Sequence, residues 1–242
     1  ESISLLSGPS SVAYGNGSMG GAIIFNTKNP VEKKSLNFHQ QFESSSNTII
    51  SNVEARYYKE NILNITAFCF KSAGNLNMGG SRNHGYEGWG QEAVSSKKKE
   101  QLYTNYNQTD FIHKTKYSFA PGRFFLSNTQ YSKSSIIYRF DKMNDMNGEN
   151  AKYLHWYYGP QIRFLKNISY HYRKTTSIFD NVKAGVSFQQ IKESRHTQLF
   201  EEELLNNRKE MVNIYDINLD FKKSLSSIDF SYGAGGRMER IS

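Results

Sequence analysis

The sequence predicts an all-β protein, a transmembrane antiparallel β-barrel of the kind that crosses an outer membrane with strands. Three observations point to this fold. Apolar and polar residues alternate with a period of two in several segments, and long and short connections between these segments alternate. No run of about 18 apolar residues occurs, so a transmembrane helix is excluded. In such a barrel only every second residue faces lipid, so a low average hydropathy is compatible with a bilayer.

Strand patterns begin at residue 35 and continue along the rest of the chain. The alternation is less regular around 61–71, 108–118, 123–134 and 162–172, where strand propensity persists, and 227–238 completes the series. We therefore expect about nine strands. Four segments alternate clearly, and their apolar sides are Leu36, Phe38 and Phe42; Ser51, Val53, Ala55 and Tyr57; Val182, Ala184, Val186 and Phe188; and Tyr215, Ile217, Leu219 and Phe221.

The connections between these segments distinguish a barrel from a soluble β-sandwich, which would show the same alternation. Outer-membrane barrels have short periplasmic turns and long extracellular loops, whereas a sandwich has no reason to alternate them. On this assignment the first barrel strand rises from the periplasm. The short links are 58–61, 119–122 and 223–226, the long ones are 73–107, 135–160 and 194–208, and the exceptions are a brief link at 44–47 and a medium one at 173–180.

Composition and charge exclude several classes of protein. Of the 242 residues, 37% are hydrophobic and 14% aromatic, which is too polar for a helical membrane protein. The formal charge is +8, but the basic residues are scattered and no nucleic-acid-binding motif accompanies them, so no nucleic acid partner is expected. The charge suits anionic partners such as lipopolysaccharide. The single cysteine, Cys69, excludes an internal disulfide and is best explained as a small apolar residue.

Residues 1–28 place a glycine-rich turn between two short strand-like runs, 3–6 and 22–27, with a helical turn expected after Gly8. Gly15, Gly17 and Gly20 satisfy G-x-G-x-x-G, but a dinucleotide fingerprint needs a strand before the glycines and a helix after them. The stretch instead resembles the C-terminal end of the plug domain of TonB-dependent outer-membrane receptors, although Ser7 stands where arginine is usual. The matching residues are Gly8, Pro9, Ser10, Ser11, Tyr14, Gly15, Gly17, Gly20, Gly21, Thr27 and Lys28.

The resemblance implies a division into the end of a plug, 1–30, and the first part of a barrel, 31–242. Receptors of this family close with about twenty-two strands, so we expect the chain to be a fragment. The resemblance also implies active uptake of a scarce nutrient across the outer membrane of a Gram-negative bacterium. The energy would come from the TonB–ExbB–ExbD complex. The segment that contacts this complex is not expected in this chain. An iron chelate (siderophore), haem or a corrinoid is the favoured substrate. The alternatives are a glycan-importing receptor of this family and a non-transporting adhesin or lectin-like β-sandwich.

The long connections hold the candidate substrate-binding residues. Aromatic, arginine and histidine side chains among glycines can stack on planar ligands and donate charge-assisted hydrogen bonds. Tyr157 and Tyr158 fit a binding role and the interfacial aromatic girdle of a barrel about equally. The candidates are Arg82, His84, Tyr86 and Trp89 in the first long connection, Arg139, His155 and Trp156 in the second, and Arg195 and His196 in the third.

No motif in the sequence predicts catalysis or a resident cofactor. There is no G-x-S-x-G elbow, no H-E-x-x-H, and no EF-hand loop, so we expect neither an enzyme nor a metal site. His39, His113 and His171 fall in predicted strands, where we expect them on the inward, polar side.

Overall fold

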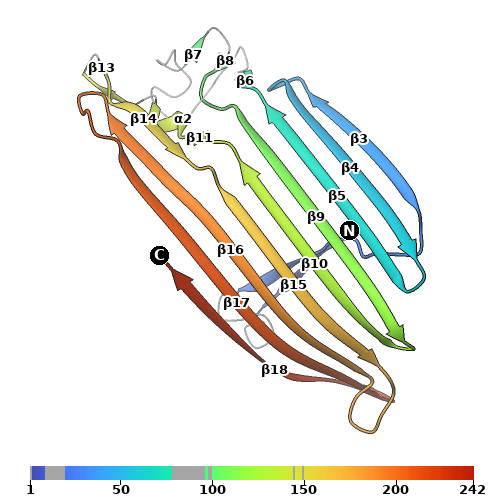
Figure 1. Ribbon diagram of the computed structural model, residues 1–242. Helices are drawn as coiled ribbons and strands as arrows, with labels where there is room; N and C mark the ends of the chain where they lie inside the picture. Colours follow the sequence, from blue (N-terminus) through green and yellow to red (C-terminus); the bar gives the residue numbers. More distant parts are fainter. Residues whose placement is uncertain (1, 9–19, 78–95, 98–99, 144, 149) are drawn as a thin grey trace. The chain divides into compact units, whose positions relative to one another are not determined.

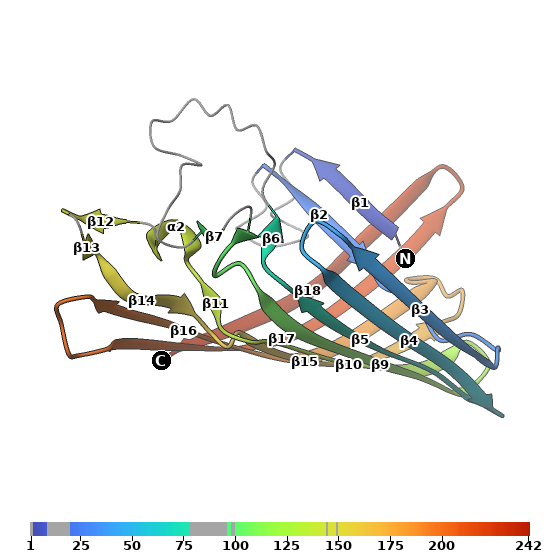
Figure 2. The ribbon, with the colours of Figure 1, turned by 90° about the horizontal axis from the view of Figure 1, so that it is seen from above.

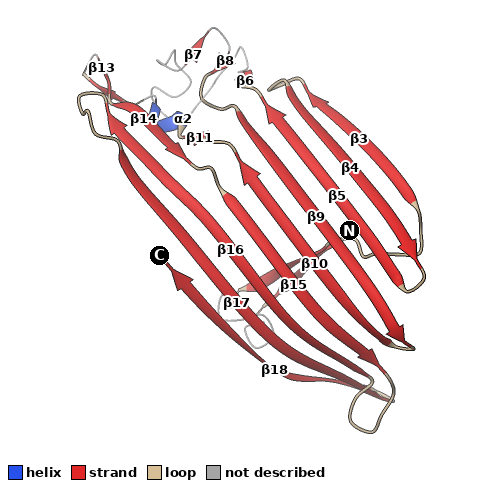
Figure 3. Ribbon diagram, in the orientation of Figure 1, coloured by secondary structure: helices blue, strands red, loops and turns tan. Residues whose placement is uncertain are grey.

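The computed structural model describes residues 2–8, 20–77, 96–97, 100–143, 145–148 and 150–242. The chain divides into two compact units, Glu1–Pro30 and Val31–Ser242. Within the described ranges nearly all regular structure is β, and the single helix is the short α2 (Phe140–Met143) (Figure 1 and Figure 3). The predicted all-β class is confirmed, and its strands pair antiparallel.

The first unit is a two-stranded antiparallel sheet of β1 (Ser2–Ser7) and β2 (Gly21–Asn26), at the two positions predicted for strands. Gly21 has a φ of +137°, and a Cβ there would collide with the carbonyl oxygen of Leu6, so the start of β2 requires glycine. The expected turn between these strands lies outside the described residues, and with it lie Pro9, Tyr14, Gly15 and Gly17.

The second unit is built on one large antiparallel sheet in which each long strand pairs with the next along the chain (Figure 1). Nine long strands lie side by side, as predicted. They are β3 (Ser35–Glu43), β4 (Thr48–Lys59), β5 (Ile62–Ala73), β9 (Tyr106–Ala120), β10 (Arg123–Ser134), β15 (Ile162–Arg173), β16 (Asn181–Leu199), β17 (Asn206–Leu225) and β18 (Ile228–Ile241).

Shorter strands occupy the connections. β11 (Ile137–Tyr138) pairs with β14 (Tyr153–Tyr158), and β14 pairs with the last residues of β16, so β14 prolongs the line of β15 along β16. Two small separate sheets complete the described structure: β6 (Leu76–Asn77), β7 (Ser96–Lys97) and β8 (Glu100–Gln101), and β12 (Met146–Asn147) with β13 (Asn150–Ala151).

The connections alternate between two ends of the sheet, which we call the turn end and the loop end. The third long connection was predicted wrongly: β16 continues to Leu199 and β17 begins at Asn206, so Arg195 and His196 lie in a strand. They pair with Arg208 and Asn207 in a stretch that is polar on both faces, which an apolar alternation cannot reveal. The turn end holds 60–61, 121–122, 174–180 and 226–227, and the loop end holds 44–47, 74–105, 135–161 and 200–205.

The register places large exposed apolar side chains on one side of the sheet, which we call the apolar face. Phe38, Val53 and Phe68 are directly paired across β3, β4 and β5 and therefore share this face. Further members on the same face are Leu36, Phe42, Ile49, Tyr57, Ile62, Phe70, Tyr117, Phe125, Ile168, Val186, Tyr215, Ile217, Leu219, Phe230, Tyr232 and Met238.

The opposite side, the polar face, carries charged side chains. Arg56 contacts Glu54 at 2.8 Å, and Arg237 contacts Asp216 at 2.6 Å. Lys114 is buried on this face. Figure 2 shows that the sheet of the second unit is curved. Side chains on the concave side of a curved sheet lie closer together than those on the convex side. The burial of Lys114 therefore indicates that the polar face is the concave, inner face of the sheet.

Polar side chains interrupt the apolar face in β5 and β9. His113 Nδ1 lies 2.8 Å from Thr66 Oγ1 and its Nε2 lies 3.0 Å from Thr115 Oγ1, which donates to Asn64 at 2.8 Å. His113 is paired with Thr66 and so lies on the apolar face, contrary to the inward position expected for it. These polar atoms satisfy one another, which lowers the cost of placing them among apolar side chains.

Candidate functional site

Four side chains gather on the polar face at the loop end, and we call them the Trp156 cluster: Arg139, Trp156, Tyr158 and Arg195. Trp156 and Tyr158 are two residues apart in β14, and side chains alternate between the two faces of a strand, so these two lie on the same face. Arg195 is paired with Tyr158 across β14 and β16. Arg139 follows β11, and its backbone N–H donates to the carbonyl of Trp156 at 2.9 Å.

The cluster combines two guanidinium groups with two aromatic rings. Arg139 Cζ lies 4.8 Å from the ring centroid of Trp156, and Arg195 Cζ lies 5.8 Å from Trp156 and 5.5 Å from Tyr158. The two rings meet edge to face, with centroids 5.1 Å apart and planes at 72°. Each guanidinium–ring contact contributes about 0.5–2 kcal/mol, depending on its exposure. The arrangement holds flat cations and flat rings on one surface.

The two arginines differ in their charge balance. Arg139 donates to both carboxylate oxygens of Asp141 and to the hydroxyl of Tyr158 at 3.1 Å. The bond from Arg139 lowers the pKa of Asp141 and raises that of Arg139, so both groups stay charged. Arg195 forms no ion pair with a carboxylate among the described residues. Glu193 and Glu210, paired with each other two positions along the same strands, share its face, and Glu210 contacts Arg208, so Arg195 has acidic neighbours without a direct ion pair.

A second group of rings lies on the other side of the same strands. Tyr157 stacks on His196 with centroids 4.6 Å apart, contacts His155 edge-on at 6.4 Å, and packs on Tyr138 at 5.5 Å. His196 also contacts Ser194 Oγ at 2.9 Å. The structure therefore separates the predicted residues: Arg139, Trp156 and Arg195 come together, whereas His155 and His196 lie on the opposite side with Tyr157.

Tyr158 is the member of the cluster that sequence reasoning left undecided. The strand position of β14 resolves its orientation: Tyr158 points with Trp156, and Tyr157 points away from it. The aromatic residues at 156–158 have high strand propensity. That propensity is the sequence signal that could have predicted a strand here, and with it the alternating directions of these side chains.

The candidates Arg82, His84, Tyr86 and Trp89 lie outside the described residues, so their role stays a prediction. In the part of the chain that the structure describes, no group of three or more histidine, cysteine or acidic residues could hold a metal ion. None of its helices is long and apolar enough to cross a membrane.

Comparison with known proteins gives no family for this chain. No model of a protein family matches the sequence, and no curated protein matches it either. Function is therefore proposed from the fold, the Trp156 cluster and the glycine-rich stretch near the N-terminus.

Proposed function

We propose that this chain belongs to a TonB-dependent receptor that imports a scarce nutrient across the outer membrane of a Gram-negative bacterium. The observation that supports this most strongly is the two-sided sheet. On its apolar face Leu36, Phe38 and Ile217 are exposed by 75%, 66% and 63%. In water, so large an exposed apolar surface calls for a partner, and in a barrel that partner is lipid.

The sheet then has a defined orientation in the membrane. Its turn end lies at the periplasm and its loop end outside the cell, because outer-membrane barrels have short turns on the periplasmic side. The Trp156 cluster then lies at the extracellular end, on the inner side of the barrel wall, where an arriving nutrient would meet it. The glycine-rich stretch from Gly8 to Gly21 supports the family assignment through its resemblance to a plug domain. The energy for transport then comes from the TonB–ExbB–ExbD complex.

The chemistry of the cluster favours an anionic substrate with a flat part, such as an iron chelate, haem or a corrinoid. Arg195 offers a guanidinium that forms no direct ion pair with a described carboxylate, and Trp156 offers a flat ring beside it. A neutral glycan would use the rings but would leave the guanidinium without a counter-charge, so a glycan importer is less favoured. A β-sandwich adhesin would bury one face of its sheet against a second sheet, which does not suit the exposed Phe38 and Ile217.

Growth under limitation tests the proposed substrate. A deletion strain is complemented with the whole gene and grown with haem, ferric siderophores or a corrinoid as the only limiting nutrient. We expect the deletion to abolish growth on one of these sources and the gene to restore it. Equal growth of the deletion strain on all of them would reject the proposed substrates.

A further inference from the structure

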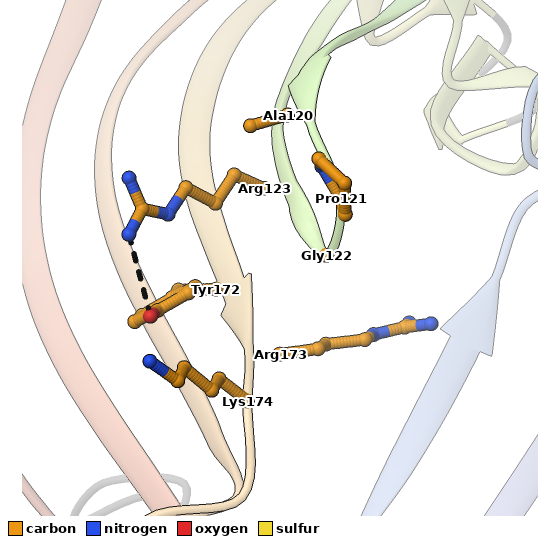
Figure 4. Close-up of a pocket in the computed structure, with 7 residues that line it drawn as sticks. All are labelled: Ala120, Pro121, Gly122, Arg123, Tyr172, Arg173 and Lys174. Carbon is orange, nitrogen blue, oxygen red and sulfur yellow. Dashed lines mark hydrogen bonds between the residues drawn. The ribbon is translucent and has the colours of Figure 1, made fainter.

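A shallow hollow at the turn end collects basic side chains (Figure 4). It has a volume of about 500 Å³. It forms where the turn between β9 and β10 meets the end of β15, and Ser118 and Arg173 tie these segments to their neighbours through backbone hydrogen bonds. The lining residues are Ala120, Pro121, Gly122, Arg123, Tyr172, Arg173 and Lys174.

Two of its three cations point to the same side. Figure 4 shows Arg123, Tyr172 and Lys174 directed to one side of the strands and Arg173 to the other. Arg123 Cζ lies 4.6 Å from the ring centroid of Tyr172, and its Nη2 donates to the Tyr172 hydroxyl at 3.3 Å. Tyr172 pairs with Val182 on the apolar face, so Arg123 and Lys174 stand at the edge of that face.

No carboxylate in the surrounding turns neutralises this pair. The hollow itself is lined by no acidic residue. Asp180, on the same connection as Lys174, already accepts from Lys223 Nζ at 2.9 Å and from the backbone N–H of Ser224 at 2.8 Å. Within the described ranges neither Arg123 nor Lys174 forms an ion pair, so both charges are available to an anion.

A patch of packed aromatic rings adjoins the cations on the apolar face. Phe119 contacts Phe125 at 5.6 Å and Tyr170 at 6.2 Å between centroids, and Tyr117 contacts Phe119 at 6.2 Å. Tyr117, Phe119 and Phe125 are each more than 40% exposed. Aromatic rings of this kind sit at the headgroup level of a bilayer, and cations just beyond them sit at the phosphate level.

We propose that Arg123 and Lys174 bind a phosphate group, and that its source is a phospholipid of the periplasmic leaflet whose acyl chains lie along Phe119, Phe125 and Tyr170. This inference rests on the proposed function, because it needs the turn end to lie at a membrane surface. Arginine can donate two parallel hydrogen bonds to the oxygens of a phosphate, and lysine adds a point charge. The adjoining rings favour a lipid over free phosphate, which has no apolar part to place there.

The test measures lipid retention by native mass spectrometry of the whole protein purified from membranes and exchanged into detergent with added phosphatidylglycerol. The double variant Arg123→Gln/Lys174→Gln is expected to reduce bound phosphatidylglycerol by about tenfold, since each basic residue near an anionic surface contributes to binding. Lys209→Gln, which removes one exposed charge at the loop end of the same face, is the matched control and should retain lipid as the wild type does. Unchanged lipid retention in the double variant would overturn the proposal.

Two further arms separate the possible outcomes. Inorganic phosphate at millimolar concentration should not displace the lipid, and displacement would show a site for free phosphate instead. Heat-modifiable gel mobility shows whether each variant is folded. If the double variant is not folded, the single variants Arg123→Gln and Lys174→Gln are measured in its place. A wild-type protein absent from the membrane fraction would refute the proposed function, whereas a membrane protein that retains no phosphatidylglycerol would refute this site alone.

Discussion

Asp141 holds the guanidinium of Arg139 at two points, accepting from Nε at 2.8 Å and from Nη2 at 2.6 Å. This pairing fixes the plane of the guanidinium, which lies 4.8 Å from the ring centroid of Trp156. Asp141 thus orients one cation of the Trp156 cluster and neutralises it. Arg195 is left as the cation that can meet a negative charge.

Replacing Arg195 by glutamine should weaken substrate binding while the fold stays intact. The variant loses the positive charge that would meet an anionic group of the substrate, and a hydrogen bond to a charged group contributes about 1.5–3 kcal/mol, so the Kd should rise by roughly tenfold or more. The measurement is the Kd of whichever nutrient supports growth. Lys192→Gln removes a charge from the opposite face of the same strand and should bind as the wild type does. Equal affinity of Arg195→Gln and wild type would remove Arg195 from the binding site.

The Arg139–Asp141 pair should make stability depend on pH in acid. Because Arg139 lowers the pKa of Asp141 below 3.8, the pair stabilises the folded protein above that value, and the contribution disappears as pH falls through the lowered pKa. Both groups are partly exposed, so the effect is no more than about 1 kcal/mol.

The measurement for this pair is the Tm of wild type and Asp141→Asn in detergent. The wild type should be more stable at about pH 6, and the two should converge below pH 3.8. A difference that persists in acid would show that the carboxylate acts in some other way.

Two adjacent residues of β4 test which face meets lipid. Val53 lies on the apolar face and Asn52 on the polar face. In the proposed barrel Val53→Lys places a charge in the bilayer at a cost of about 2–4 kcal/mol near its midplane, whereas Asn52→Lys faces the interior and should assemble almost normally. The fraction of each variant that reaches the folded, heat-modifiable form measures the difference. Equal assembly of the two would contradict the assignment of the faces.

Gly122 in the turn between β9 and β10 should tolerate alanine poorly. Its φ is +70°, and a Cβ would collide with the carbonyl oxygen of Arg173. Gly148 has a similar φ of +65°, and no atom of the described residues lies within 4 Å of a Cβ there, so Gly148→Ala costs only the backbone strain. We expect about 1 kcal/mol for Gly148→Ala and at least about 2 kcal/mol for Gly122→Ala, measured from urea unfolding midpoints. A smaller effect at Gly122 than at Gly148 would contradict the turn geometry.

The sequence allowed the strands to be found wherever one side is apolar, as at Phe38 and Ile217. It failed where polar residues continue a strand, because Arg195 and His196 lie in β16 without any apolar alternation. The irregular pattern of β5 and β9 also has a structural cause: Thr66 and His113 satisfy each other on the apolar face, while Leu63 and Ile65 are buried on the polar face.

The sequence predicted which types of residue the candidate site contains, but not which of these residues lie together in space. Arginine and tryptophan in the second and third long connections were recognised as ligand-binding types. Only the register between β14 and β16 shows that Arg195 joins Trp156 while His196 turns away to Tyr157. Such pairing depends on contacts between distant segments, which local sequence patterns do not encode.

The most direct test of the central proposal is the location and gel mobility of the whole protein in its own host. Membranes are fractionated, and the outer-membrane fraction is run on a gel with and without boiling. We predict that the protein is found in that fraction and that the unboiled form migrates faster, because a folded barrel resists unfolding in detergent. A protein recovered in the soluble fraction, with one mobility under both conditions, would contradict the proposal.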